Sequence, residues 1–545
     1  MKRIFFILLA LSTISFLTSC NKNSAEPHSA ISNADDFSNL SPFKYTISTD
    51  LEDNENDQIE ILVAMNSQKG QFPVKYDLDC NGDGEYEYKG LTENKTCIYP
   101  NHSGTHQIWV RGIIPAMFLC ARQDDDSDSN CDPNQSDDEQ SPICVLPSGA
   151  DDSHDAIVSI DSWGNIPWKS MEFFAAGCFE LHTLPQDSPD LSHVKDMSYM
   201  FSNTYAFNQP IEHWNVSNVE NMHAMLAATE IFNQPLEKWD VSNVKDMSNL
   251  FSAAESFNQP LEKWNVSNVK NMSNMFSSAE SFNQPLEKWN VSNVKNMLGM
   301  FYSAYAFNQP LEKWNVSNVE DMAGMFAAAE SFNQPIGNWD VSNVKDMSHM
   351  FRGAYAFNQP LENWDVSNVK DMNSMFEGSM SFNQPLGKWN VSNVEDMSGM
   401  FVMAPAFNQP LEDWNVSNVK DMSHMFHSAV SFNQPLEKWN VSNVEDMSYM
   451  FMGALFFNQP LNNWNVIKVI SMEGMFIGAA AFDQPLDKWN VSNVMTMKEM
   501  FYRASSFNHY PSRWVIPEAA HQDMFTDTPV EELSQKKPLK VRSDF

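Results

Sequence analysis

A period of 25 residues governs most of this chain. Thirteen tryptophans recur at that interval between Trp214 and Trp514, and a Phe-Asn-Gln-Pro block keeps the same spacing from Phe207 to Phe457. A fixed period in this range is typical of a solenoid, in which each unit buries its apolar face only against its neighbours. We therefore expect residues 192–515 to form a solenoid of 25-residue coils.

The coil that begins at Trp264 indicates how such a unit could pack. Trp264 and Val266 alternate with polar residues, which predicts a short strand. The apolar residues that follow have the spacing i, i+3, i+4 and i+7 of one helix face: Met272, Met275, Phe276 and Ala279. Stacking would place identical side chains above one another, with Asn268 and Asn283 and their equivalents in amide ladders.

The repeated unit is Trp-Asn/Asp-Val-Ser-Asn-Val-x-x-Met-x-x-Met-Phe-x-x-Ala-x-x-Phe-Asn-Gln-Pro-Leu/Ile. It resembles the BspA-like leucine-rich-repeat surface proteins of bacteria. The resemblance implies an α/β, leucine-rich-repeat-like solenoid, and some members of that family are implicated in adhesion to host or matrix proteins. The chain departs from the family in one respect, since its repeats are nearly identical to one another.

The first residues predict export. Lys2 and Arg3 precede an apolar stretch, Ile4 to Leu11, that is too short to span a bilayer, so residues 1–19 are expected to be a signal peptide. The sequence Leu17-Thr18-Ser19-Cys20 resembles the bacterial lipobox. That resemblance implies lipidation of Cys20 and a lipid-anchored location in the bacterial cell envelope, at the outer membrane or cell surface. Residues 20–40 are rich in Ser, Asn and Asp with little apolar content, which predicts a flexible tether.

Residues 41–120 have the pattern of a small β-sandwich. Short segments rich in β-branched and aromatic residues are separated by turn residues: Tyr45–Ile47, Ile59–Val63, Val74–Tyr76 and Gln107–Val110. The run from Tyr76 to Gly84, followed by Gly104 to Val110, resembles PKD-type immunoglobulin-like domains. Such domains are usually spacers on surface proteins.

Five oxygen-bearing side chains stand at alternate positions in this domain: Asp77, Asp79, Asn81, Asp83 and Glu85. This spacing is similar to that of the EF-hand loop and predicts a possible Ca²⁺ site, the one cofactor that the sequence suggests. The twelfth position is Tyr88 where the EF-hand has a bidentate Glu. A hairpin turn rich in Asp and Gly is therefore the favoured alternative.

The cysteines are compatible with disulfides in an exported protein. Cys80 and Cys97 lie in short segments that could pair across a hairpin, so we predict a disulfide between them. Cys178 lies in an apolar run and is expected to be a buried thiol. Sequence alone leaves the pairing of Cys120, Cys131 and Cys144 open.

Three further segments complete the predicted organisation. Residues 121–155 are an acidic loop or linker, residues 156–191 are a cap on the first coil, and residues 516–545 are a C-terminal cap and tail. The tail after Glu532 is polar and is expected to be loose.

The composition excludes some functions. A net charge of −36 without a Lys/Arg cluster argues against nucleic acid as a partner. No metalloprotease, phosphate-loop or nucleophile-elbow motif is present, so we do not expect an enzyme.

We expect a non-catalytic binding or adhesion module for an unidentified protein or glycan. The alternative is a structural spacer or stalk without a specific ligand. Exposed positions that repeat along the coils are the candidate binding face: Glu262, Lys263, Glu287, Lys288, Glu312 and Lys313.

Overall fold

The computed structural model describes residues 40–49, 57–61, 75–92, 95–99, 104–113, 156–517, 522–537 and 539–542. The chain divides into two units, residues 1–39 and 40–545, and every described residue lies in the second. The expected signal peptide, the lipidation site Cys20 and the acidic segment of residues 121–155 lie outside the described residues.

A β-sheet domain opens the second unit. Its main sheet has the order β4-β3-β6-β1-β7, with every pairing antiparallel. These strands are β1 (Phe43–Thr49), β3 (Lys75–Asp79), β4 (Tyr88–Leu91), β6 (Gly104–Ile113) and β7 (Ala156–Ser162). A second antiparallel pair joins β2 (Asp57–Ile61) to β5 (Lys95–Tyr99). All four segments that the sequence predicts as strands fall in or overlap these strands.

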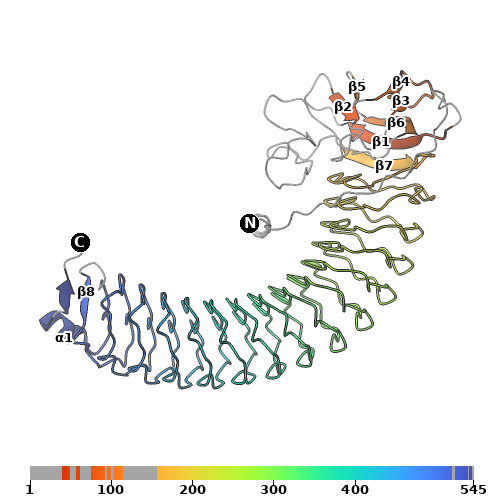
Figure 1. Cartoon of the computed structure of the whole chain (residues 1–545). Coiled ribbons are helices and arrows are strands. Elements are labelled where there is room, and N and C mark those ends of the chain that lie inside the picture. Colours follow the sequence, from red (N-terminus) through yellow and green to blue (C-terminus); the bar gives the residue numbers. More distant parts are fainter. Residues whose placement is uncertain are drawn as a thin grey trace. The chain divides into compact units, whose positions relative to one another are not determined.

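Strand β7 connects the sheet to the repeats (Figure 1). One side of β7 pairs with β1, and the other side forms a parallel bridge from Ser159 to Thr183. The Ile160 N–H donates to the Thr183 carbonyl at 3.0 Å. Residues 156–162, expected to belong to the cap of residues 156–191, form the edge strand of the sheet. The sheet itself therefore covers the first coil.

The repeats form successive coils of 25 residues, which we call the repeat stack (residues 192–515). Single-residue parallel bridges join residues 25 apart, from Asp196 and Asn221 through to Ser471 and Thr496. Figure 1 shows the coils lying beside one another in chain order. The rest of each coil consists of turns and extended segments.

The expected short helix and short strand of each coil are both wrong. Within the described residues the only helix is α1 (Glu531–Lys536), and no strand includes Trp264 or Val266. The N–H groups of Asn274 and Ser278 bond to carbonyls of the next coil, so they do not make the i→i−4 bonds of a helix. Both residues have left-handed backbones, with φ of +53° and +55°.

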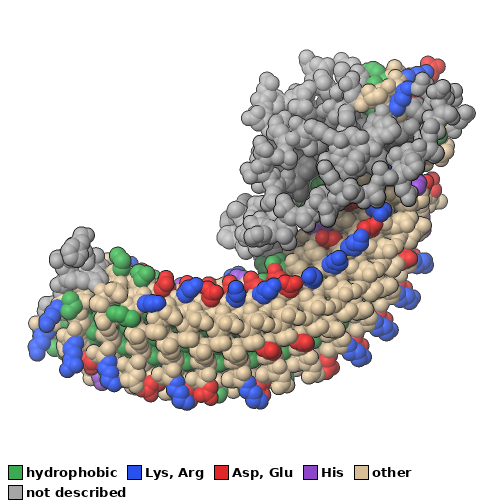
Figure 2. Space-filling view, viewed as in Figure 1, with side chains coloured by type: hydrophobic (Ala, Val, Ile, Leu, Met, Phe, Trp, Pro, Cys, Tyr) green, Lys and Arg blue, Asp and Glu red, His purple; other side chains and the backbone are tan. Residues whose placement is uncertain are grey.

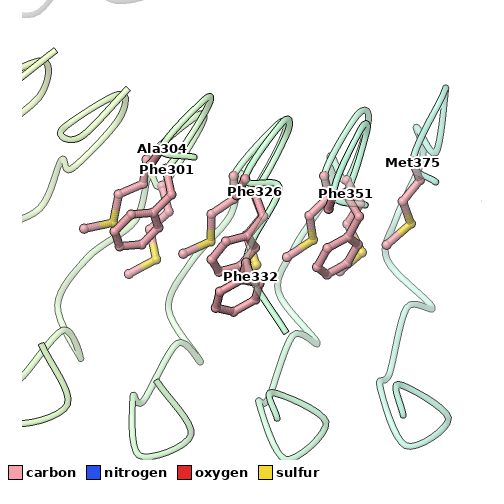
Figure 3. Packing of buried hydrophobic residues seen from close by; sticks show 14 of the residues in the cluster. Phe301, Ala304, Phe326, Phe332, Phe351 and Met375 are labelled. Carbon is pink, nitrogen blue, oxygen red and sulfur yellow. The ribbon is translucent and has the colours of Figure 1, made fainter. Parts of the chain in front are cut away.

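Apolar side chains fill the coils as continuous columns. Phe301 and Phe326 stack with centroids 5.7 Å apart, and Phe326 and Phe351 follow at 5.9 Å. Within one coil Phe326 stacks on Phe332 at 4.0 Å. Figure 3 shows this repetition from coil to coil, with Met375 one coil further on. The columns predicted from the period are confirmed, and they account for the invariant Trp, Phe and Met positions.

Neighbouring coils are not equally spaced at all points. Backbone bridges hold two chains about 4.8 Å apart. The Phe251 and Phe276 rings are separated by 5.6 Å, and the Trp264 and Trp289 rings by 6.4 Å at an interplanar angle of 2°. Such nearly parallel rings are related by simple translation, so their separation measures the local distance between coils. Adjacent coils therefore lie closest along the bridges and furthest apart along the Trp column.

The C-terminal end is more ordered than the sequence suggests. Strand β8 (Val515–Pro517) pairs in parallel with β9 (Lys540–Arg542), and α1 lies between them in the sequence. The Phe525 ring stacks on Phe501 at 5.6 Å and closes the Phe column. The expectation of a loose tail after Glu532 is therefore wrong for residues 533–537 and 539–542. In the described part of the chain, no helix combines the length and apolar character needed to cross a bilayer.

Candidate binding surface

The predicted binding face is a ladder of ion pairs between coils. Each Lys reaches back to the Glu of the preceding coil: Lys263 to Glu237 at 3.1 Å, Lys288 to Glu262 at 3.0 Å, and Lys313 to Glu287 at 2.9 Å. Glu312 instead accepts from the Asn338 amide at 3.1 Å. The structure thus brings these six residues together, and their charges are largely matched within the chain.

A second charged row runs along the stack beside the bridges. Glu220 pairs with Lys195 at 2.7 Å and also with Lys245, one coil away on each side. These contacts hold the pKa of Glu220 below its usual value. Figure 2 shows two rows in which Lys and Arg lie next to Asp and Glu. Exposed pairs of this kind contribute about 0–1 kcal/mol each, so their main effect is to neutralise one another.

Amide ladders complete the fixed part of the surface. The Asn258 side-chain oxygen accepts the Asn283 backbone N–H at 3.0 Å and the Gln284 amide at 3.0 Å. The Asn268 amide donates to the Ser242 carbonyl at 2.7 Å. The predicted amide ladders are therefore confirmed, and these polar side chains are occupied in joining coils.

Six neighbouring positions of each coil differ in chemical class from coil to coil, and they define a surface that we call the variable face. In the coil of Trp264 they are Ser273, Asn274, Ser277, Ser278, Glu280 and Ser281. The position of Ser277 holds Tyr302, Arg352, Glu377 and His427 in other coils, whereas Phe occupies the position of Phe276 in nearly all. A surface that varies over a nearly constant apolar core is the natural candidate for recognition.

The backbone beneath the variable face is fully engaged. The N–H groups of Met272, Asn274, Phe276 and Ser278 bond to the next coil at 2.6–3.0 Å. Those of Met275, Ser277 and Ala279 bond three residues back at 3.1–3.2 Å within their own coil. This alternation fixes the direction in which each Cα–Cβ bond leaves the backbone. The variable face is consequently a rigid platform, which reduces the entropy lost on binding.

The side chains at the position of Glu280 divide the variable face into two halves. From Tyr205 to Tyr355 the position holds only Glu and Tyr, with exposed carboxylates at Glu230, Glu255, Glu280 and Glu330. Burial, and then the charge of Glu230, raises the pKa of Tyr205. From Met380 to Ala480 the position is apolar: Met380, Pro405, Val430, Leu455 and Ala480.

A column of carboxylates borders the variable face. Six consecutive bridge positions hold half-buried aspartates: Asp321, Asp346, Asp371, Asp396, Asp421 and Asp446. Burial, and secondarily the charges of Asp346 and Asp396, raises the pKa of Asp371 to about 6, although the Asn373 N–H opposes this shift. Burial likewise raises the pKa values of Asp321 and Asp421. Burial therefore disfavours the charged form at these three aspartates.

Histidines on the variable face are partly desolvated. His223 contacts the Ser248 hydroxyl at 2.6 Å and the Tyr199 hydroxyl at 2.8 Å, and burial lowers its pKa. Burial also lowers the pKa of His427, whose ring lies 5.6 Å from that of His424. Both sites favour neutral imidazole at pH 7, so they act as hydrogen-bonding surface groups.

The predicted calcium loop follows β3, and its carboxylates have protein partners. Asp79 is fully buried and accepts the N–H groups of Gly82 at 2.6 Å and Gly84 at 2.8 Å. Asp77 pairs with Arg111 at 3.2 Å.

Nearer the tip of the turn, the Asn81 side-chain oxygen accepts the Asp83 N–H at 2.9 Å, and the Asp83 carboxylate accepts the Glu85 N–H at 2.7 Å. Gly82 has a φ of +69°, as a tight turn requires. In the described residues no three His, Cys, Asp or Glu side chains converge as metal ligands. The geometry is that of the alternative, an Asp/Gly hairpin turn, and calcium binding stays a prediction.

The structure describes the side chains of two of the cysteines, Cys80 and Cys178. Cys80 is disulfide-bonded, but the Cys97 side chain lies outside the described residues, so their pairing stays a prediction. Cys178 is a buried thiol as expected, and burial raises its pKa to about 12. Cys120, Cys131 and Cys144 also lie outside the described residues.

The variable face was not among the predicted sites, although the repeats contain a signal for it. Aligning the repeats with one another separates constant positions from variable ones without any relative of the protein. Glu262 and Lys263 were selected because they are polar and periodic, yet periodic charges are the ones that neighbouring coils can pair. Variation within the repeat is the better criterion for a recognition surface.

Comparison with known proteins agrees with the repeat organisation. Four overlapping segments, residues 169–289, 273–385, 359–455 and 431–536, match a family described as Mycoplasma protein of unknown function, DUF285. Together they span the repeat stack and both of its ends. A search of curated proteins found no significant match.

Proposed function

Because the chain belongs to the DUF285 family, whose description assigns no activity, we propose a function from the surface itself: a non-catalytic module that binds an extended partner along the variable face. The observation that carries the proposal is the contrast between surfaces. Charged and amide side chains elsewhere on the coils mainly join one coil to the next. The six positions of the variable face range from apolar to charged between coils, although some of their side chains, such as Arg352 and Glu377, also pair.

The rigidity of the variable face supports this proposal. Its backbone is held by bonds between coils and within coils, as at Asn274 and Ser277. A platform fixed before contact loses little conformational freedom on binding. Many weak contacts along such a platform sum to useful affinity when the partner is itself extended.

The proposal extends to the setting of the module. We propose that the repeats form a leucine-rich-repeat-like solenoid similar to that of the BspA-like proteins, and that the β-domain preceding them is PKD-like. Lipidation of Cys20 after removal of residues 1–19 would anchor it in the bacterial cell envelope, where a protein or glycan ligand is accessible. The matching periodic sequence, the strands of residues 43–113 and the lipobox-like sequence support these points.

A structural spacer remains the second candidate, and one observation favours it. Ion pairs, amide bonds and aromatic columns run without a break along the repeats, and covers lie at both ends. That continuity would suit a stalk as well as a binding platform. The two functions differ in whether the variable face has a ligand.

The experiment compares surfaces on the full-length chain. One variant changes the variable face (Tyr305→Ser with Tyr355→Ser), and a matched variant changes the paired ladder (Lys263→Ser with Lys288→Ser). Both are tested against a panel of matrix proteins and glycans by surface plasmon resonance. Saturable binding that is lost only in the variable-face variant supports the proposal. Binding that both variants retain overturns the assignment to the variable face, and no binding to any panel member favours the spacer.

A further inference from the structure

An exposed apolar strip occupies the second half of the variable face. It consists of the exposed side chains of Met380, Met403, Leu455 and Phe456 and the partly buried Pro405 and Val430, which lie on four adjacent coils. The exposed fractions are 46% for Met380, 52% for Met403, 43% for Leu455 and 60% for Phe456. In the coil of Trp264 the corresponding positions hold Ser278, Glu280 and Ser281. Large exposed apolar groups grouped in this way mark an interaction site.

The strip is continuous because the coils beneath it are bonded to one another. The Met403 N–H donates to the His427 carbonyl at 2.8 Å, and the Ser428 N–H donates to the Met452 carbonyl at 2.6 Å. The Leu455 carbonyl accepts the Ala481 N–H at 3.1 Å. The partly buried side chains of Val402, Met452 and Ile477 add apolar surface beside it.

The other half of the same face is acidic. Glu230, Glu280 and Glu330 are exposed, and no ion pair joins them to a Lys or Arg in the described parts of the chain. The tyrosines between them, Tyr305 and Tyr355, offer ring faces that attract cations. An occupant of the apolar strip that continues along the face would therefore meet unneutralised carboxylates and aromatic rings.

Charge decides among the possible occupants. A second copy of the chain carries a net charge of −36 and would be repelled. The chain's own segment from Asp124 to Asp155 contains no Lys or Arg and does not complement the acidic half. A polypeptide with a basic segment adjoining an apolar one complements both halves.

We propose that the variable face binds an extended polypeptide in which a Lys/Arg-rich segment adjoins an apolar segment, the apolar part lying on the strip from Met380 to Phe456 and the basic part on the Glu/Tyr half. The proposal rests on the binding function proposed above and names its class of ligand. Nine coil steps separate Glu230 from Leu455. At roughly 5 to 6 Å per step this is about 50 Å, the length of about 15 extended residues.

The test uses fluorescent 15-residue synthetic peptides and the full-length chain, with binding followed by anisotropy. One peptide joins a Lys/Arg half to a Leu/Val half, in both orders. Control peptides replace the basic half by Glu or the apolar half by Ser. The structure predicts saturable binding of the basic–apolar peptide in at least one order, weakened by added salt, and affinity at least about tenfold lower for both controls.

Two double variants locate the contacts. Leu455→Ser with Phe456→Ser, and Glu280→Lys with Glu330→Lys, should each weaken the basic–apolar peptide by about tenfold or more. The matched charge reversal, Glu262→Lys with Glu287→Lys in the ion-pair ladder, should change its affinity less than about threefold. Circular dichroism of each variant reports whether the fold is kept.

The outcomes separate this proposal from the binding function. Equal affinity for the basic–apolar and control peptides, or full affinity in the variable-face variants, overturns the ligand assignment. If a matrix protein or glycan still binds through the variable face, the binding function stands while the peptide proposal fails. If no ligand depends on that face, both fail.

Discussion

The indole Nε1–H of Trp264 donates a hydrogen bond to the backbone carbonyl of Leu236, 2.9 Å away in the neighbouring coil. The same bond recurs from Trp239, bonded to Ile211, to Trp489, bonded to Leu461. Each tryptophan thus belongs to the apolar column and also uses the only hydrogen-bond donor of its side chain, the indole N–H. The column is fixed in register by polar contacts as well as by packing.

Replacing this donor should weaken the stack locally. Trp264→Phe removes this N–H, and the Leu236 carbonyl keeps only its bond from the Trp239 backbone N–H. The lost hydrogen bond costs about 0.5–1.5 kcal/mol in the free energy of unfolding, and the smaller ring adds a loss of packing. Urea unfolding followed by far-ultraviolet circular dichroism measures the loss. Lys263→Ala, which removes one exposed ion pair beside it, should cost no more than about 1 kcal/mol. Equal stabilities for the two variants would refute a structural role for the indole bond.

Left-handed positions offer a test of backbone strain. Ser278 has a φ of +55°, a conformation that costs a residue with a Cβ atom more than it costs glycine. Ser278→Gly should therefore stabilise the chain by about 0.5–1 kcal/mol, whereas Ser278→Val should destabilise it. The control is Ala279→Gly, at a buried position without positive φ, which should destabilise by about 0.5–1 kcal/mol. A destabilised Ser278→Gly variant would contradict the assigned geometry.

The aspartate column should make the stack more stable in mild acid. The pKa of Asp371 is about 6 when folded, against an unfolded value near 3.9, so the folded state binds more protons between these values. Stability contributed by protonated Asp371 is fully present below about pH 4 and is lost as the pH rises through 6. Because Asp371 is only partly buried, solvent screening limits the effect to about 1 kcal/mol.

Asp371→Asn isolates this contribution. Asparagine keeps the acceptor for the residue two positions on, as Asn271 does for the Ser273 N–H. The variant should be more stable than the parent at pH 7.5 and equally stable at pH 4, as measured by urea midpoints at the two pH values. Asp365→Asn, at an exposed position, is the control and should leave the pH profile unchanged. A parent chain that is more stable at pH 7.5 than its Asp371→Asn variant would overturn this account.

The turn after β3 gives a test of calcium binding. Asp79 already accepts two glycine N–H groups, so we expect the melting temperature to be the same in excess Ca²⁺ and in chelator. Asp79→Ala should lower the free energy of unfolding of the β-domain by about 1–3 kcal/mol in either condition, because buried donors lose their acceptor. A higher melting temperature in Ca²⁺, abolished by Asp83→Asn, would instead establish the metal site.

Several features could be predicted because the repeat period alone determines which residues of neighbouring coils lie next to one another. A period of 25 places Phe301 over Phe276 and Asn283 over Asn258, whatever the path of the chain between them. The local conformation could not be predicted in the same way. The spacing of Met272, Met275, Phe276 and Ala279 suits one face of a helix, but a series of turns buries the same four residues. Periodicity reports which residues are buried and does not distinguish between the backbones that can bury them.

The arrangement of the coils also changed which surface is proposed to bind a partner. Glu262 and Lys288 are 26 residues apart, and only the stacking of coils shows that they neutralise one another. Likewise, the acidic and apolar halves of the variable face are formed by residues of many coils. No single repeat contains that division.

The sequence by itself determined the 25-residue unit, its buried side chains and the amide ladders, because each depends only on which residue recurs at which position. The tertiary structure alone decided the backbone of the coil, the cover that β7 provides and the pairing of surface charges. These depend on hydrogen bonds and ion pairs between residues of different coils or domains. Whether an N–H bonds within its own coil or to the next depends on how closely the coils approach, which the order of residues does not record.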